Sequence, residues 1–190
     1  EAAATNICLQ SEDLSTTWLL QNAAIDTNVA VAPDGTTTMD RLNVTVTLGN
    51  HNAYQAITVV SGTDYVTSVY IKDDGAGFGG VCFGTGADFI TVVANLSTGV
   101  VTDTEVGGTS GTIVDSGCDS VGNGIYRVWV SGSIAITAGF GIPFASDSGT
   151  PASYVSGRPS YNGVAGEDIL IWGAQLETGS FPTAYIPTTT

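Results

Sequence analysis

RLNVTVTL, residues 41–48, alternates apolar and polar side chains without interruption. The apolar members are Leu42, Val44, Val46 and Leu48, and the polar members between them are Asn43, Thr45 and Thr47. Because successive side chains of a β-strand point to opposite faces, this alternation predicts a strand with one buried and one exposed face.

Similar stretches recur along the rest of the chain. They are YVTSVYIK (65–72), FITVVAN (89–95), IYRVWVSG (125–132), SIAITAGF (133–140) and DILIWGAQLE (168–177). Gly, Asn, Asp or Ser separates successive stretches, as in turns between antiparallel strands, and helical periodicity is nearly absent. The sequence therefore predicts an all-β fold, a two-sheet antiparallel β-sandwich of the jelly-roll type, but it does not fix the strand order.

The composition fits a single domain over residues 1–190. Apolar residues make up 43% of the chain, and four Lys and Arg face 18 Asp and Glu, for a net charge of −14. So few cations argue against nucleic-acid binding, because a protein must neutralise phosphates with Lys and Arg. The same charge disfavours docking on anionic membranes, and no stretch reaches the ~18 apolar residues of a membrane-spanning helix.

The first residues, EAAATN, lack an initiator Met, a basic start and the apolar segment of a signal peptide. We therefore expect a processed protein, an excised module or part of a longer chain.

Residues suited to catalysis have little support from their context. His51 is the only histidine, and no nucleophile-elbow sequence accompanies it, so we expect an exposed loop residue. A glycosidase needs two carboxyl groups in distinct environments, and nothing singles out Glu105, Glu167 or Glu177. We expect no enzyme activity.

The three cysteines, Cys8, Cys82 and Cys118, are compatible with one disulfide and a spare thiol. Packing in or near the core is the simpler interpretation, and a lone histidine without Cys-x-x-Cys argues against a zinc site.

The acidic, Gly-rich stretch KDDGAGFGG (72–80) makes Asp73 and Asp74 candidate calcium ligands, because calcium takes six to eight oxygens from flexible loops. The spacing is not that of an EF-hand, and an ordinary turn is the alternative. No other cofactor is expected.

Two long segments, residues 72–88 and 143–168, are expected to be loops, where a sandwich usually carries its binding residues. Glycan binding needs aromatic faces and a few planar polar groups. The candidates are Tyr54, Tyr154, Arg158, Tyr161 and Asn162. Trp129 and Trp172 lie on predicted strands, so we expect them to pack in the sandwich.

Four stretches share a family resemblance. They are NICLQSEDLSTTW (6–18), APDGTTTMDRL (32–42), GNGIYRVWVSG (122–132) and IWGAQLETGSFPTAYIPTTT (171–190). In this order they resemble the lectin-like jelly-roll modules, similar to concanavalin A and carbohydrate-binding modules, of tailed-bacteriophage structural proteins such as tail fibres, appendages and capsid decorations. Similar modules occur on secreted polysaccharide-degrading enzymes. Ile125 stands where such modules usually carry an aromatic residue, and Met39 stands in place of a small residue.

The resemblance gives the closing stretch a structural meaning. It implies that DILIWGAQLE is a central strand buried on both faces and that NICLQS is paired close by. Residues 181–190 are then a C-terminal clasp and connector, with Phe181, Tyr185 and Ile186 covering one open end of the core. Pro182 and Pro187 would keep this segment extended.

The resemblance also implies a function. We expect a non-enzymatic virion structural protein at the extracellular surface of a phage capsid or tail, which stabilises the particle or contacts host surface polysaccharide. Its partners would be other virion subunits and sister copies, with no nucleic acid and no membrane insertion. The alternative is a carbohydrate-binding module excised from a secreted polysaccharide-degrading enzyme or a bacterial surface adhesin.

Overall fold

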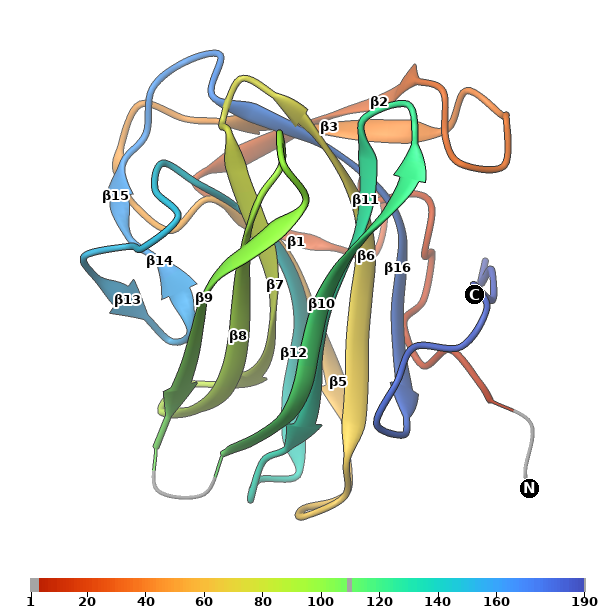
Figure 1. The fold of residues 1–190 in the computed structure, drawn as a ribbon, viewed down its shortest axis with the longest axis vertical. Coiled ribbons are helices and arrows are strands. Elements are labelled where there is room, and N and C mark those ends of the chain that lie inside the picture. Colours follow the sequence, from red (N-terminus) through yellow and green to blue (C-terminus); the bar gives the residue numbers. More distant parts are fainter. Residues whose placement is uncertain (1–3, 109–110, 190) are drawn as a thin grey trace.

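The computed structural model describes residues 4–108 and 111–189, which form two six-stranded sheets with no helix in the described ranges (Figure 1). Sheet A contains, in spatial order, β1 (Leu19–Gln21), β5 (Asn52–Thr58), β12 (Ala138–Ser146), β7 (Phe78–Thr85), β8 (Asp88–Asn95) and β9 (Val100–Gly107). Sheet B contains β10 (Thr112–Gly122), β11 (Ile125–Ser133), β6 (Tyr65–Asp74), β16 (Asp168–Thr178), β3 (Met39–Val44) and β2 (Ala23–Ala30). Two short strand pairs complete the fold, the hairpin of β13 (Tyr154–Val155) with β14 (Arg158–Pro159) and the long-range pair of β15 (Tyr161–Asn162) with β4 (Leu48–Gly49). The predicted all-β, two-sheet fold is confirmed.

The strand order, which the sequence did not predict, is that of a jelly roll. Counted along the chain, the eight inner strands are β3, β5, β6, β7, β8, β11, β12 and β16. Sheet B places the first, eighth, third and sixth of them side by side, and sheet A the second, seventh, fourth and fifth. All neighbours are antiparallel. This is the order that two interlocked Greek keys produce.

The main core lies between the two sheets and follows the period of two. In β16, Ile169 and Ile171 point into this core, while Leu170 and Trp172 join a second cluster on the outer face of sheet B. In β11, Val128 and Val130 point inward. Such alternation is what lets one short strand bury a side-chain row on each face.

The outer face of sheet B is covered by the C-terminal tail. Tyr185 packs against Trp172, with ring centroids 4.5 Å apart, and against Tyr70. The expectation of a central β16 buried on both faces is confirmed, but the second cover is this tail and not the other sheet. The tail therefore does not cover an open end of the core as predicted, and Phe181 is 63% exposed beside Trp129.

The N-terminal segment also lies along β16. The backbone N–H of Ile7 donates to the carbonyl of Leu176 at 2.8 Å, and that of Ala174 donates to Ser11 at 2.9 Å. The predicted pairing of NICLQS near the C-terminal strand is confirmed. Both ends of the described chain consequently leave the sandwich on the same side, next to β16 (Figure 1).

Strand β7 corrects the prediction of a loop over residues 72–88. Its sequence, FGGVCFGT, looked like a flexible linker, yet it is an inner strand of sheet A. A Cβ at Gly80 would lie 2.7 Å from the ring of Phe144 on the adjacent strand, and one at Gly79 would lie 3.2 Å from Leu96. The glycines are therefore required by close packing.

Two predicted strand boundaries were also wrong. β3 ends at Val44, and Val46 and Leu48 are each 72% exposed, because residues 45–49 turn away to pair with β15. SIAITAGF is not one strand, since β11 extends to Ser133 and β12 begins at Ala138.

Candidate functional site

A segment of 20 residues, 147–166, crosses the outer face of sheet A, and we call it the strap. Its hairpin β13–β14 turns at Ser156 and Gly157, both of which have positive φ. The carbonyl of Gly157 accepts a buried hydrogen bond of 2.6 Å from the Thr91 hydroxyl of β8. The tip of the hairpin therefore sits directly on the sheet.

Two predicted glycan-binding residues belong to this hairpin. The hydroxyl of Tyr154 donates to Oδ2 of Asp103 on β9 at 2.8 Å, and burial together with this carboxylate raises the pKa of Tyr154 above its ordinary value. Arg158 is half-buried, and burial lowers its pKa. Its Nε is buried without a hydrogen-bond partner in the described part of the chain. Tyr154 therefore ties the strap to β9, while the half-buried Arg158 lies near Cys82 and Tyr54.

Tyr161 is buried at one end of the sandwich. Its ring centroid lies 4.6 Å from that of His51, and only 7% of the residue is exposed. Burial is the main cause of its raised pKa, with Asp147 adding to it. His51 is not the exposed loop residue that we expected: it is fully buried, and its Nδ1 contacts the carbonyl of Asn22 at 2.8 Å.

The remaining predicted residues lie at the edges of the strap. Tyr54, on β5, is half-buried beside the outer cluster of sheet A, which contains Cys82, Phe89, Val93 and Phe144. Asn162, on β15, is exposed. Four of the five predicted residues thus belong to the strap and Tyr54 lies beneath it, and among the five only Asn162 is exposed to solvent.

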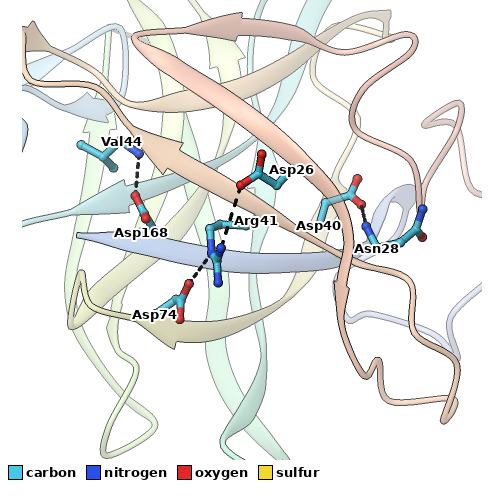
Figure 2. Close-up of polar contacts among 7 residues, drawn as sticks. All are labelled: Asp26, Asn28, Asp40, Arg41, Val44, Asp74 and Asp168. Atoms are coloured by element: carbon cyan, nitrogen blue, oxygen red, sulfur yellow. Dashed lines mark hydrogen bonds and ion pairs between the residues drawn. The ribbon is translucent and has the colours of Figure 1, made fainter. Parts of the chain in front are cut away.

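Asp73 and Asp74 each have a structural partner. Oδ1 of Asp73 accepts the backbone N–H groups of Gly75 and Gly77, and Asp74 pairs with Arg41. Figure 2 shows Arg41 between Asp74 and Asp26. Within the described residues, no group of three or more His, Cys, Asp or Glu could hold a metal ion. This geometry favours the turn over the calcium site.

The three cysteines are free thiols. Burial raises the pKa of Cys8 to about 12 and that of Cys82 and of Cys118 to about 11. The thiols are therefore protonated at neutral pH and poor nucleophiles. The expectation that they pack in or near the core is confirmed, since Cys8 and Cys82 are buried in core clusters and the half-buried Cys118 packs against the main core.

A cleft of about 260 Å³ lies where the two ends of the chain meet, and we call it the terminal cleft. Its polar lining consists of Gln10, Glu12, Asp13, Asn28, Thr38, Thr188 and Thr189, and Pro187 adds an apolar surface. Apart from Asn28, these residues come from three of the four stretches that carry the family resemblance. Nothing in the sequence indicates that these residues lie together, because they form a cleft only when both chain ends pack beside β2 and β3.

Hydrogen bonds with neighbouring side chains fix the residues that line the terminal cleft. The hydroxyl of Tyr185 donates to Oε1 of Glu12 at 3.1 Å, and Nε1 of Trp172 donates to the hydroxyl of Thr38 at 3.0 Å. Asp40 accepts the backbone N–H of Leu14 at 2.9 Å and that of Asn28 at 3.0 Å, the latter contact being visible in Figure 2. Burial raises the pKa of Asp40. The cleft is thus pre-formed.

No protein-family model and no curated protein matches the chain. Among solved structures, it is similar to the enzymatically active domain of tailspike protein 4 of bacteriophage CBA120, with 15% identity and a TM-score of 0.48, over 91% of this chain and 21% of that chain. It is also similar to the CBM22-1–GH10 modules of Clostridium thermocellum xylanase 10B, with 13% identity and a TM-score of 0.48, over 97% of this chain and 29% of that chain.

Sequence identities of 13% and 15% and a TM-score of 0.48 are too low to indicate the ligand or the activity of this chain. This chain spans less than a third of either solved chain. No helix long and apolar enough to cross a membrane occurs in the described ranges.

Proposed function

We propose that this chain is a non-enzymatic structural module of a tailed-bacteriophage virion. It would be displayed on the capsid or tail, stabilise the particle and contact host surface glycans. The four stretches that resemble phage jelly-roll modules support the phage setting, and the site geometry supports the absence of catalysis and the presence of a ligand cleft.

The observation that carries the structural role is the fastening of both chain ends to one central strand. The Asn6 amide donates to the carbonyls of Ala174 and Ile186, at 3.0 and 2.9 Å. The hydroxyl of Thr188 donates to the carbonyl of Cys8 at 2.6 Å, and its N–H donates to Ser11 at 2.9 Å. A load applied at the ends is therefore borne by β16 in the middle of sheet B, which suits a module held by its ends in a particle.

The C-terminal tail is also held by hydrogen bonds between Thr183 and two charged side chains, Glu177 and Arg127. Glu177 is fully buried and accepts the N–H and the hydroxyl of Thr183, at 2.8 and 2.7 Å. Arg127 donates to the Thr183 carbonyl and to the hydroxyl of Ser68. The buried carboxylate and the buried guanidinium both bind the same turn, so releasing this turn would leave costly unpaired buried charges. Residues 181–190 would thus act as both clasp and connector.

The absence of catalysis is supported by the state of the reactive side chains. His51 is enclosed with Nδ1 held by a backbone carbonyl, so it has no access to a substrate. The cysteine thiols are protonated at neutral pH. A nucleophile needs a base within hydrogen-bond reach, and neither group meets this requirement.

The test is a binding screen of the purified chain against host-surface polysaccharides, with and without added calcium, in which reducing ends are assayed in the same samples. We expect selective binding, unchanged by calcium, without release of reducing ends. Hydrolysis abolished by replacing a single carboxylate would overturn the non-enzymatic assignment. A catalytic domain in the same natural chain would instead identify a carbohydrate-binding module of a secreted enzyme.

A further inference from the structure

We propose that the terminal cleft is a binding site for a neutral saccharide. This inference rests on the glycan-contact part of the proposed function and names its place and ligand class. The predicted aromatic residues of the strap are not part of it, because they are committed to holding the strap on sheet A.

The lining presents hydrogen-bonding groups of the kinds that sugar hydroxyls match. Amide groups come from Gln10 and Asn28, carboxylates from Glu12 and Asp13, and hydroxyls from Thr38 and Thr188. The described structure gives the amides of Gln10 and Asn28 no hydrogen-bond partner. A hydroxyl group of a sugar both donates and accepts, so it can join an amide to a carboxylate. The ring of Pro187 offers an apolar surface for sugar C–H groups.

The charge of the cleft selects against acidic sugars. Its lining contains two carboxylates and no Lys, Arg or His, and the whole chain carries a net charge of −14. A uronate, sulfate or phosphate group would enter a negative potential without a cation to pair with. A neutral hexose or its oligomer meets no such repulsion.

The two residues that carry the free amides, Gln10 and Asn28, have an unusual backbone conformation. Gln10 has φ of 48° and Asn28 has φ of 58°, both in the left-handed region. Few non-glycine residues adopt this region, and they concentrate at functional sites. At Asn28 the conformation is fixed from behind, because its N–H donates to the buried carboxylate of Asp40. The backbone that carries the Asn28 amide is thus fixed before any ligand arrives, which removes part of the entropic cost of binding.

The size of the cleft limits the ligand. A volume of about 260 Å³ lies just below the roughly 300–1,000 Å³ of pockets for drug-sized ligands. It suits one or two sugar rings of a longer glycan, entering from the solvent-exposed side of Asn28 and Thr189. Recognition would be of a terminal or branch sugar rather than of a long extended chain.

The test uses glycine variants, since glycine keeps a positive φ while removing the side chain. Isothermal titration calorimetry measures the binding of the wild-type chain to neutral oligosaccharides of glucose, mannose and galactose, and to oligogalacturonate. Asn28→Gly and Gln10→Gly remove one cleft amide each. Asn123→Gly is the matched control, because Asn123 is an exposed asparagine with φ of 55° in the turn between β10 and β11.

We expect the wild-type chain to bind a neutral oligosaccharide and not to bind oligogalacturonate. Each cleft variant should weaken the binding of the neutral oligosaccharide by about tenfold or more, which corresponds to one lost hydrogen bond to the ligand. Asn123→Gly should bind like the wild type, and all variants should keep the wild-type melting temperature.

If the wild type binds neutral sugars and both cleft variants bind equally well, the cleft is not the site, although the glycan-contact function stands. If only the acidic oligomer binds, the ligand class is wrong. If no saccharide binds, the cleft proposal and the glycan-contact function both fall.

Discussion

The ring of Tyr185 lies 4.5 Å from the ring of Trp172, centroid to centroid. Tyr185 belongs to the C-terminal tail and Trp172 to the central strand of sheet B, so this contact seals the outer face of that sheet with the end of the chain. Trp172 is 3% exposed as a result. The same two side chains fix Glu12 and Thr38 in the terminal cleft. Fold stability and cleft geometry therefore depend on one aromatic pair.

Replacing this tryptophan should destabilise the fold severely. We expect Trp172→Ala to reduce the free energy of unfolding by about 3–5 kcal/mol, because the change leaves a cavity between Tyr70, Tyr185 and Leu170. Chemical denaturation of both proteins measures this difference. An unchanged denaturation midpoint would contradict the packing described for the outer face of sheet B.

The Asn6 side chain joins three parts of the chain. Its amide donates to Ala174 and Ile186, and its Oδ1 accepts the N–H groups of Cys8 and Leu176. Removing it leaves several buried backbone groups unpaired, each at a cost of about 1–3 kcal/mol when water cannot replace the partner. We expect Asn6→Ala to lower stability by about 2–4 kcal/mol and to increase hydrogen exchange in residues 183–188.

The exposed Asn162→Ala variant is the control for that measurement and should leave both quantities unchanged. Wild-type exchange rates in the tail of Asn6→Ala would show that the tail is held by other contacts.

The strap should control access to Cys82, since a Cβ at Gly157 would lie 2.6 Å from the Cys82 sulfur. Gly157→Ala is therefore expected to lift the hairpin and to raise the labelling rate of Cys82 by a thiol reagent by about tenfold or more, with the labelled site read by mass spectrometry. Gly166→Ala is the matched control, because Gly166 also has positive φ but would place its Cβ in open space. Equal labelling of Cys82 in the two variants would contradict the docking of the hairpin.

Stability should fall in alkaline solution. Burial raises the pKa of Cys8 to about 12 and that of Cys82 to about 11, whereas an unfolded cysteine has a pKa of about 8.5. Between these values the folded state holds protons that the unfolded state has lost, so stability is full below about pH 8.5 and decreases as the pH rises, by about 1.4 kcal/mol per pH unit for each thiol. The buried hydroxyls of Tyr161 and Tyr185, whose pKa burial also raises, add to this loss above about pH 10.

Denaturation midpoints at pH 7.5, 8.5, 9.5 and 10.5 measure this dependence. A Cys8→Ala variant should be less stable at pH 7.5 but should show a shallower decrease above pH 8.5. The same slope in both proteins would mean that Cys8 is not enclosed.

The sequence predicts the fold class because strands such as IYRVWVSG and DILIWGAQLE alternate or bury apolar residues in short runs bounded by turn residues. It misplaces β7, because FGGVCFGT reads as a linker until Phe144 is known to lie against Gly80. Val46 and Leu48 continue the apolar alternation beyond Val44 but belong to a different pair of strands. The alternation of apolar and polar residues does not show where a strand stops pairing within one sheet and turns away from it.

The candidate site was less predictable for a related reason. Aromatic and amide residues in a long loop suggest a ligand surface, yet Tyr154 and Tyr161 are partners of Asp103 and His51 within the fold. The residues of the terminal cleft are scattered from Gln10 to Thr188 and become neighbours only through the packing of both chain ends. No spacing in the sequence marks them.

The measurement that tests the proposed virion role most directly is immunogold electron microscopy, with an antibody against this chain, on phage particles purified from cultures of the organism that carries its gene. The account predicts gold on the capsid or tail surface in regular positions, together with the chain in the purified particle proteome. Particles that contain no copy of the chain, with the chain found instead in a secreted protein fused to a catalytic domain, would contradict a virion role.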